Sequence, residues 1–110
     1  MITTGPVRAS GYAVQLRRAA FGALKRAIDA GVVAADAVNA EVARVNQALY
    51  HVLVEEFAVP KDSVVNVTAQ YELGDGFRIT DVEVEVYKLD ADLSGAVTAE
   101  ARRALSPGSA

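Results

Sequence analysis

The chain has 110 residues, a formal net charge of −3 and no cysteine. This length fits one domain, and a composition of 52% hydrophobic and 23% charged residues is typical of a folded globular protein. The lack of cysteine excludes disulfide bonds and thiolate metal sites, and no apolar run is long enough for a membrane-spanning helix. The N-terminus has no signal-peptide pattern, so we expect a cytoplasmic protein with no membrane partner.

The charges are divided unevenly along the chain. Residues 1–28 contain five basic residues and no acid, whereas residues 29–110 contain six basic residues and fourteen acids. The first segment therefore carries +5 and the second −8, which together give the net charge of −3. Few amide side chains are present (three Asn and three Gln), which is a pattern of heat-adapted proteins.

The first half of the chain predicts a short strand and two helices. Residues 5–10 form an extended segment, in which Pro6 suits the start of a strand. Apolar residues at spacings of three and four predict helices over 12–29 and 35–58. We expect the second helix to end before Pro60, because proline disfavours helical geometry in the preceding residue.

The second half predicts a β-hairpin and a tail. Residues 63–73 alternate between apolar and polar side chains, "GDG" at 74–76 suits a tight turn, and 77–89 form the return strand. The apolar positions of the return strand change phase, so we expect a β-bulge near Thr80–Asp81. The tail, 91–110, begins as a loop, and 97–105 can form one or two helical turns.

These elements predict an α+β fold. The order is strand, helix, helix, strand, strand, and the natural layer arrangement packs the two main helices on one face of a small antiparallel sheet. The first strand then pairs beside the hairpin. We expect one nucleic-acid-binding domain over residues 1–90, followed by the C-terminal tail, 91–110.

Catalytic chemistry is not indicated. His51 is the single histidine, no serine lies in a nucleophile elbow, and no glycine-rich phosphate loop is present. Asp81, Glu83 and Glu85 alternate on one strand face, but a hard cation needs oxygen ligands from several segments. We therefore expect no enzyme activity, no cofactor and no metal site.

The basic segment "RRAAFGALKR", 17–26, carries the strongest functional signal. On a helix, Arg17, Phe21 and Lys25 stack along one ridge, and Arg18, Gly22 and Arg26 lie on or beside the next. Cationic side chains hold phosphates, and unpaired bases stack on aromatic rings. A nucleic-acid surface, an interface with a partner helix or second subunit, and a merely solvated helix face all remain open from spacing alone.

Three stretches resemble the ThermoDBP-related proteins, a family of small archaeal proteins. They are "GPVRASGYAVQLRRAAFGALKRAI" (5–28), the N-x-A-L-Y pattern in "VNQALYHVLVEEF" (45–57) and "KDSVVNV" followed by a tyrosine (61–71). The resemblance implies helices packed on an antiparallel sheet, a non-OB fold that binds single-stranded nucleic acid in a basic cleft bordered by apolar side chains. It covers about residues 5–89, and some members of the family have little affinity for single strands.

The resemblance implies a set of site residues and an assembly. The matching basic and aromatic residues, which we expect to bind nucleic acid, are Arg8, Tyr12, Arg17, Arg18, Phe21, Lys25 and Arg26. Among these, the four cations of 17–26 are the phosphate candidates, and Tyr12 and Phe21 the stacking candidates. Tyr50, Phe57 and Tyr71 are assigned to the core or to a subunit interface.

The expected partner is single-stranded DNA, with RNA as the other ligand of this class. The resemblance also implies a homo-oligomer, a dimer or tetramer. Some members of the family assemble through the shared domain into symmetric oligomers. The DNA-binding protein that shares this domain with the family adds a C-terminal dimerising helix with a leucine-zipper pattern. "SGAVTAEARRALSPGSA" is too short for a zipper, so the assembly is expected to use the globular domain. The alternative is a structural or regulatory homo-oligomer, or a protein-interaction module, without affinity for nucleic acid.

Overall fold

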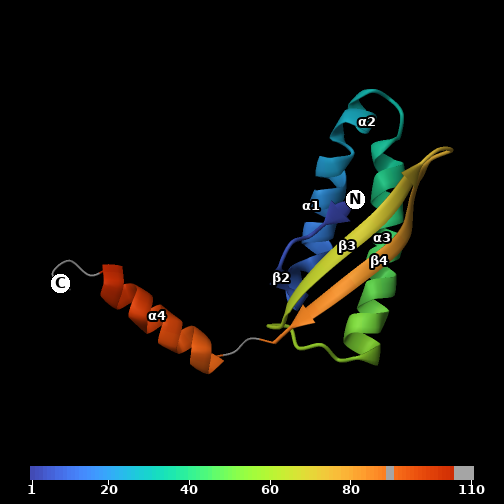
Figure 1. Ribbon diagram of the computed structural model, residues 1–110. Helices are drawn as coiled ribbons and strands as arrows, with labels where there is room; N and C mark the ends of the chain where they lie inside the picture. The colour runs from blue at the N-terminus through green and yellow to red at the C-terminus, as the bar shows by residue number, and fades with distance from the viewer. Residues whose placement is uncertain (89–90, 106–110) are drawn as a thin grey trace.

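The computed structural model describes residues 1–88 and 91–105 of the chain. Helices cover one face of a small antiparallel sheet, and a C-terminal helix leads away from this body (Figure 1). The elements follow in the order β1 (Ile2–Thr3), β2 (Val7–Arg8), η1 (Ala9–Gly11), α1 (Tyr12–Ala23), α2 (Lys25–Asp29), α3 (Ala35–Tyr50), η2 (His51–Glu56), β3 (Val64–Leu73), β4 (Phe77–Tyr87) and α4 (Ala91–Leu105). The predicted α+β fold is confirmed.

The sheet is built around β3. It pairs along its whole length with β4, and on its other edge it pairs with β1 and β2, all antiparallel. The prediction that the first strand pairs beside the hairpin is confirmed for β2, whereas the sequence analysis did not anticipate β1. In the described part of the chain, the outer edge of β4 is consequently an open edge of the sheet.

The predicted bulge is present at Thr80. Gln70 pairs with Asp81 and Tyr71 pairs with Ile79, so Thr80 is the extra residue of β4. Phe77 and Ile79, before the bulge, are buried. After the bulge, Val82 lies opposite Ala69 on the helix-covered side. The extra residue therefore keeps the apolar positions of β4 on one side despite their change of phase.

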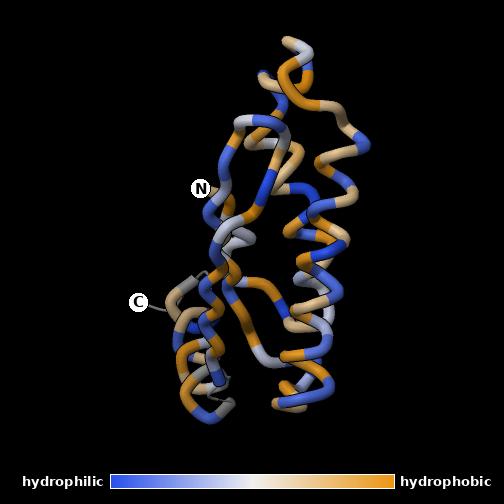
Figure 2. Tube along the Cα trace, turned by 90° about the vertical axis from the view of Figure 1, so that its right-hand side faces the viewer, coloured by the Kyte–Doolittle hydropathy of each residue, from blue (hydrophilic) through white to orange (hydrophobic). Residues whose placement is uncertain are grey.

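The core lies between the helices and the sheet. Val65, Val67 and Ala69 of β3 are fully buried, and Leu16 and Val38 of the helices meet them there. Hydrophobic and hydrophilic residues alternate along these elements, so that each presents one apolar side (Figure 2). Burial of these side chains is the main force that holds the two layers together.

The first predicted helix, 12–29, is interrupted at Leu24. Its backbone torsions, φ −102° and ψ 5°, depart from helical values and separate α1 from α2. Two helical hydrogen bonds bridge the interruption, from the Leu24 amide to the Ala20 carbonyl (3.0 Å) and from the Ile28 amide to the Leu24 carbonyl (2.9 Å). Lys25 and Arg26 therefore follow α1 without a loop.

The second predicted helix, 35–58, changes its winding after Tyr50. Residues His51–Glu56 (η2) are π-helical, and the Phe57 amide donates to the Val52 carbonyl five residues earlier (3.0 Å). A regular helix would place Glu56 on the apolar stripe that contains Leu49. Leu53, four residues after Leu49, stays in the core, and the wider turn rotates the later Glu56 away from it, where it is exposed.

The C-terminal helix is longer than predicted. α4 begins at Ala91 and spans 15 residues, whereas the sequence analysis placed a loop before residue 97. Asp92 in its first turn and Arg102 and Arg103 in its last turn match the charge preference of helix ends. The part of the predicted tail at 106–110 lies outside the described residues.

Candidate nucleic-acid interface

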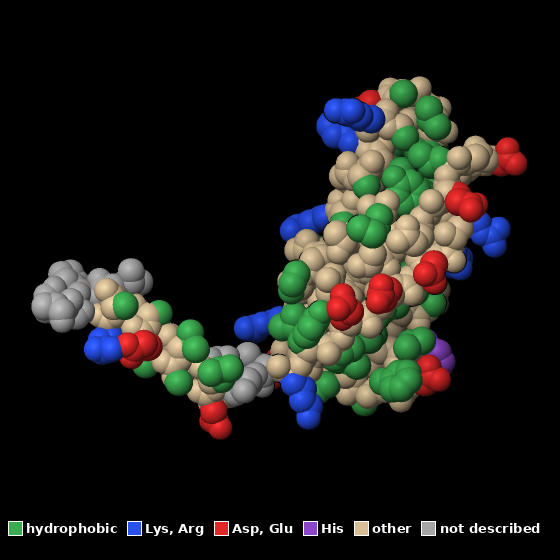
Figure 3. All heavy atoms as spheres, viewed as in Figure 1, with side chains coloured by type: hydrophobic (Ala, Val, Ile, Leu, Met, Phe, Trp, Pro, Cys, Tyr) green, Lys and Arg blue, Asp and Glu red, His purple; other side chains and the backbone are tan. Residues whose placement is uncertain are grey.

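The outer side of α1 and α2 carries the basic side chains that the sequence analysis selected. Leu16 and Ala20 face the core, and Arg17 and Arg18 face solvent on the other side of the same turns. The cations continue to Lys25 on α2, which the helical rise places about 20 Å from the start of α1. In Figure 3, Lys and Arg side chains follow the border of the molecule that α1 and α2 form.

Arg17 and Phe21 form the centre of this border. The Arg17 guanidinium carbon lies 5.2 Å from the centre of the Phe21 ring, a cation–π distance. The Arg17 Nε atom also donates to Asn39 Oδ1 of α3 at 3.0 Å. Phe21 is half-buried against the edge of the core. The predicted proximity of Arg17 and Phe21 is therefore present, with both side chains fixed by neighbours.

The remaining cations are less constrained. Within the described part of the chain, Arg8, Arg18 and Arg26 have no hydrogen-bonded or ion-paired partner for their side chains. Lys25 Nζ lies 3.7 Å from Asp29 Oδ2, but both side chains are largely exposed, so water screens this pair. Arg8 on β2 precedes α1 and stands at the opposite end of the border from Arg26.

Tyr12 does not belong to this surface. It is 6% exposed, and its hydroxyl donates to the Asn46 carbonyl at 3.3 Å. Burial raises the pKa of Tyr12, and the neighbouring Tyr50 adds to the rise. The core encloses the ring because Tyr12 occupies the same apolar side of α1 as Leu16. The assignment of Tyr12 as a stacking candidate is thus corrected.

Two of the three aromatic residues that the sequence analysis assigned to the core or to a subunit interface are exposed on the single chain, and the interface assignment stays a prediction. Tyr50 is 53% exposed and Phe57 is 71% exposed, whereas only Tyr71 is half-buried, packed against the Phe77 ring. Tyr50 lies outside the apolar stripe of α3, and this spacing was the signal that could have placed it at the surface. Asn46, one helical turn earlier on α3, donates to the Ala13 carbonyl of α1 at 3.2 Å, so the side of α3 that carries Tyr50 faces α1.

Gly22 leaves the backbone of α1 accessible. A methyl group built at this position meets no other atom within 4 Å. No packing contact within the described chain therefore requires glycine here, although glycine costs about 1 kcal/mol in a helix interior. The open position lies one turn after Arg18.

The acids occupy a different surface. Asp81, Glu83 and Glu85 alternate along β4 on the side of the sheet that no helix covers, and Figure 3 shows them as a row. Basic side chains thus follow the helical border and acids follow the open face of the sheet. A polyanion is attracted to the first surface and repelled by the second.

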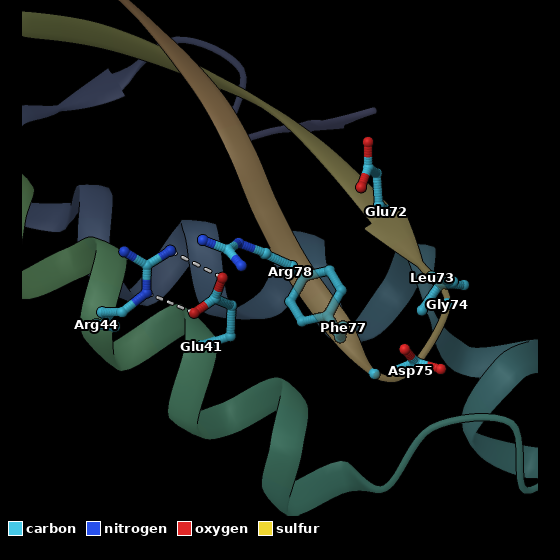
Figure 4. A pocket seen from close by; sticks show the side chains of 9 residues that line it. Glu41, Arg44, Glu72, Leu73, Gly74, Asp75, Phe77 and Arg78 are labelled. Atoms are coloured by element: carbon cyan, nitrogen blue, oxygen red, sulfur yellow. Dashed lines mark hydrogen bonds and ion pairs between the residues drawn. The ribbon is translucent and has the colours of Figure 1, made fainter.

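A hollow of about 720 Å³ lies between α3 and the hairpin turn. Figure 4 shows Glu41 and Arg44 of α3 and Arg78 of β4 pointing toward one another at one end of it. Glu41 accepts hydrogen bonds from Arg44 Nε (2.6 Å) and from the Ile79 amide (2.7 Å), which joins α3 to β4 just before the bulge. We therefore assign Glu41 a structural role.

The pKa of Glu41 reflects these contacts. The hydrogen bond from Arg44 is the main cause that lowers the pKa of the carboxyl below its ordinary value of 4.5. Burial opposes this effect, and the Ile79 amide adds to the lowering. Among the described residues, no group of His, Cys, Asp or Glu could hold a metal ion. No helix of this part of the chain is long and apolar enough to cross a membrane.

Comparisons with known proteins identify related structures. The chain is similar to apeThermo-DBP-RP2, solved bound to ssDNA dT10, with 28% identity and a TM-score of 0.77 over 94% of this chain. It is also similar to pfuThermo-DBP-RP1, with 27% identity and a TM-score of 0.71 over 94% of this chain. The chain spans 51% of the length of the first and 69% of the second.

The curated proteins gave no match. A family model described as ThermoDBP-related, archaea, matches residues 2–79, which include the helical border and end at the bulge of β4. The chain therefore belongs to the ThermoDBP-related family of archaea.

Proposed function

We propose that this protein binds single-stranded nucleic acid, DNA in preference to RNA, along the basic border formed by α1 and α2. The observation that carries the proposal is this line of exposed cations on a protein of negative net charge, with no acid before Asp29. The solved relative bound to ssDNA dT10 supports the choice of a single strand.

Phosphates are held by the side chains that have room to move. Arg8, Arg18 and Arg26 are exposed and can turn toward successive phosphates, while Lys25 is held only by a screened ion pair. Binding releases the counterions of each neutralised phosphate, so the affinity falls steeply with salt. The acidic row on β4 repels the phosphates and so keeps the nucleic acid away from the open face of the sheet.

Bases contact the fixed centre of the border. The planar Arg17 guanidinium covers the Phe21 ring and offers its own outer face for stacking. Tyr50 replaces Tyr12 as the second aromatic candidate, because it is exposed and lies one turn after Asn46 on the side of α3 that bonds to α1. Only unpaired bases offer such faces, and stacking needs no particular base, so we expect preference for single strands and tolerance of sequence.

Fluorescence anisotropy with labelled oligo-dT, oligo-rU and a duplex across a salt series tests the proposal. The double variant Arg18→Ala/Arg26→Ala removes two exposed cations whose side chains bond to no residue in the described part of the chain, so we expect it to remain folded. Its affinity for oligo-dT falls at least tenfold, and the salt slope becomes shallower by about one to two. The matched control Lys88→Ala/Arg102→Ala removes the same charge elsewhere and leaves both unchanged. Equal behaviour of the two double variants would reject the proposed border.

We also propose that the protein acts as a homo-oligomer. An alternative function is a structural homo-oligomer without affinity for nucleic acid. The row of Asp81, Glu83 and Glu85 favours it, because the basic border of one copy can contact the acidic face of another. This alternative predicts that high salt dissociates the assembly and that oligo-dT binds no better than heparin. Light scattering at low and high salt, with and without oligo-dT, separates the two.

A further inference from the structure

Among residues 1–88 and 91–105, α4 is a helix set apart from the packed helices and sheet. It extends away from the body in Figure 1, and it spans 15 residues that include Gly95. Isolated helices of about this length are marginal in water, because most helical stability comes from tertiary packing of an apolar side. A surface elsewhere is therefore needed to hold α4 in its helical form.

The apolar side of α4 is narrow and well defined. Leu93 and Val97 are 60% and 58% exposed, and they are four residues apart on one ridge. Glu100 continues this ridge and forms an ion pair with Arg103. The ridge thus presents two aliphatic side chains followed by a charged pair, over about 10 Å.

A groove of matching character lies between α3 and the open edge of β4. It has a volume of about 310 Å³, and its walls include Ala48 and Val52 on one side and Val82 on the other. Val52 and Val82 are 37% and 38% exposed, although both are aliphatic. Arg44 and Asp81 also line it. The helical side of the groove spans about 12 Å from Arg44 to Val52.

We propose that α4 of one copy docks into the α3–β4 groove of a second copy, antiparallel to α3. In this register Leu93 packs against Val52, Val97 lies over the small side chain of Ala48, and Glu100 reaches Arg44. The two lengths agree, and the acid of the α4 ridge meets a base of the groove. Apolar burial supplies the attraction, and the charges select the direction.

The helix that fills the α3–β4 groove comes from a second copy, because α4 of the same chain leads away from that groove. In Figure 1, α4 leads away on the side of the molecule where α1 lies, whereas α3 and β4 form the opposite side. The groove of a chain therefore faces away from its own α4. Exchange of one element between identical copies is a common route to symmetric assemblies. The proposal does not depend on nucleic-acid binding.

Cysteine cross-linking tests the register directly, because the natural sequence contains no cysteine. One full-length sample carries Val97→Cys and the other Ala48→Cys. When the two are mixed and oxidised, we expect a disulfide-linked heterodimer. The matched control, Ala99→Cys, lies about 200° around α4 from Val97 and gives at least tenfold less product with Ala48→Cys. Equal yields from the two pairs, or no product, would overturn the proposal.

Two further measurements identify the occupant. A chain that carries both Val97→Cys and Ala48→Cys should form linked oligomers, and a disulfide closed within single chains would overturn the exchange. Light scattering should show that Val97→Asp weakens self-association at least tenfold, whereas Ala99→Asp does not. A wild-type protein that stays monomeric would also reject the proposal. Oligo-dT titration of Val97→Asp reports separately on the basic border, so failure of one proposal is distinguishable from failure of the other.

Discussion

α1 and β4 each have one apolar side that faces the core and one charged side that faces solvent, but the charges are of opposite sign. α1 turns Leu16 and Ala20 inward and presents Arg17 and Arg18 to solvent. β4 turns Phe77 and Ile79 inward and carries a row of acids outward. A helix separates its sides with a period of 3.6 residues and a strand with a period of two. The net charge of −3 therefore describes neither surface, and the function depends on which side of each element carries the charge.

The largest expected effect comes from the inner side of α1. Leu16→Ala removes a fully buried side chain and leaves a cavity, so we expect unfolding to become easier by about 2–5 kcal/mol. Arg18→Ala, two residues later on the outer side, changes the free energy of unfolding by no more than about 0.5 kcal/mol. Urea denaturation measures both, and similar losses would show that the two sides of α1 are not distinct.

The attachment of β4 to the helices depends on Glu41. Glu41→Ala removes the acceptor of the Ile79 amide and of Arg44, with an expected loss of about 1–3 kcal/mol at neutral pH. Because folding lowers the pKa of Glu41, its contribution is present above the ordinary value of 4.5 and is lost as the pH falls through the lower folded value.

Denaturation at several pH values checks the role of Glu41. The difference between wild type and Glu41→Ala should narrow as the pH falls below 4.5. The exposed Glu55, paired with His51 at 3.7 Å, is the control, and Glu55→Ala should cost little at any pH. A gap between wild type and Glu41→Ala that stays constant with pH would contradict the assigned role of the carboxylate.

Charge reversal compares the two surfaces in binding. Arg18→Glu replaces a cation of the basic border, and we expect the affinity for oligo-dT to fall at least tenfold, which is about 1.4 kcal/mol. Glu83→Lys makes the opposite change on β4 and should strengthen binding by only a few-fold, because it acts at longer range. Anisotropy titration at one fixed salt concentration measures both. A larger effect of Glu83→Lys than of Arg18→Glu would mean that the DNA binds on the face of the sheet instead.

The smallest expected effect is at Gly22 of α1, where one substitution should change stability and binding in opposite directions. Gly22→Ala meets no neighbouring atom, so it should stabilise the fold by about 0.5–1 kcal/mol. If the DNA approaches the backbone at Gly22, the added methyl group should at the same time lower the affinity for oligo-dT. Thermal unfolding and anisotropy together measure this. A variant with unchanged affinity would remove Gly22 from the interface but leave the cations in place.

The sequence predicted most of the fold. The alternation of β3, the bulge of β4 and the apolar stripes of the helices are confirmed, because each follows from a short-range period of hydrophobic residues. The interruption at Leu24 and the π-helical turn of η2 were missed. Both are local adjustments of helices already packed on the sheet, and the short-range period of hydrophobic residues does not encode them.

The candidate site was predicted less completely. Arg17 and Phe21 lie together as a spacing of four requires, yet Tyr12 is buried, and Tyr50 is not in the core. Tyr12 falls at the border of the apolar stripe, where spacing alone does not decide burial, and the Asn46 carbonyl that holds its hydroxyl is 34 residues away. Lys25 and Arg26 keep their exposure although they belong to a separate helix.

The acidic row of β4 has a consequence for how copies of the protein meet. An open strand edge is a template for uncontrolled pairing with other strands and for fibre formation. Two β4 edges joined in antiparallel register would bring rows of carboxylates against each other on one face, and like charges opposite one another destabilise such a pair. The carboxylates of β4 therefore disfavour aggregation through edge-to-edge pairing of β4 strands.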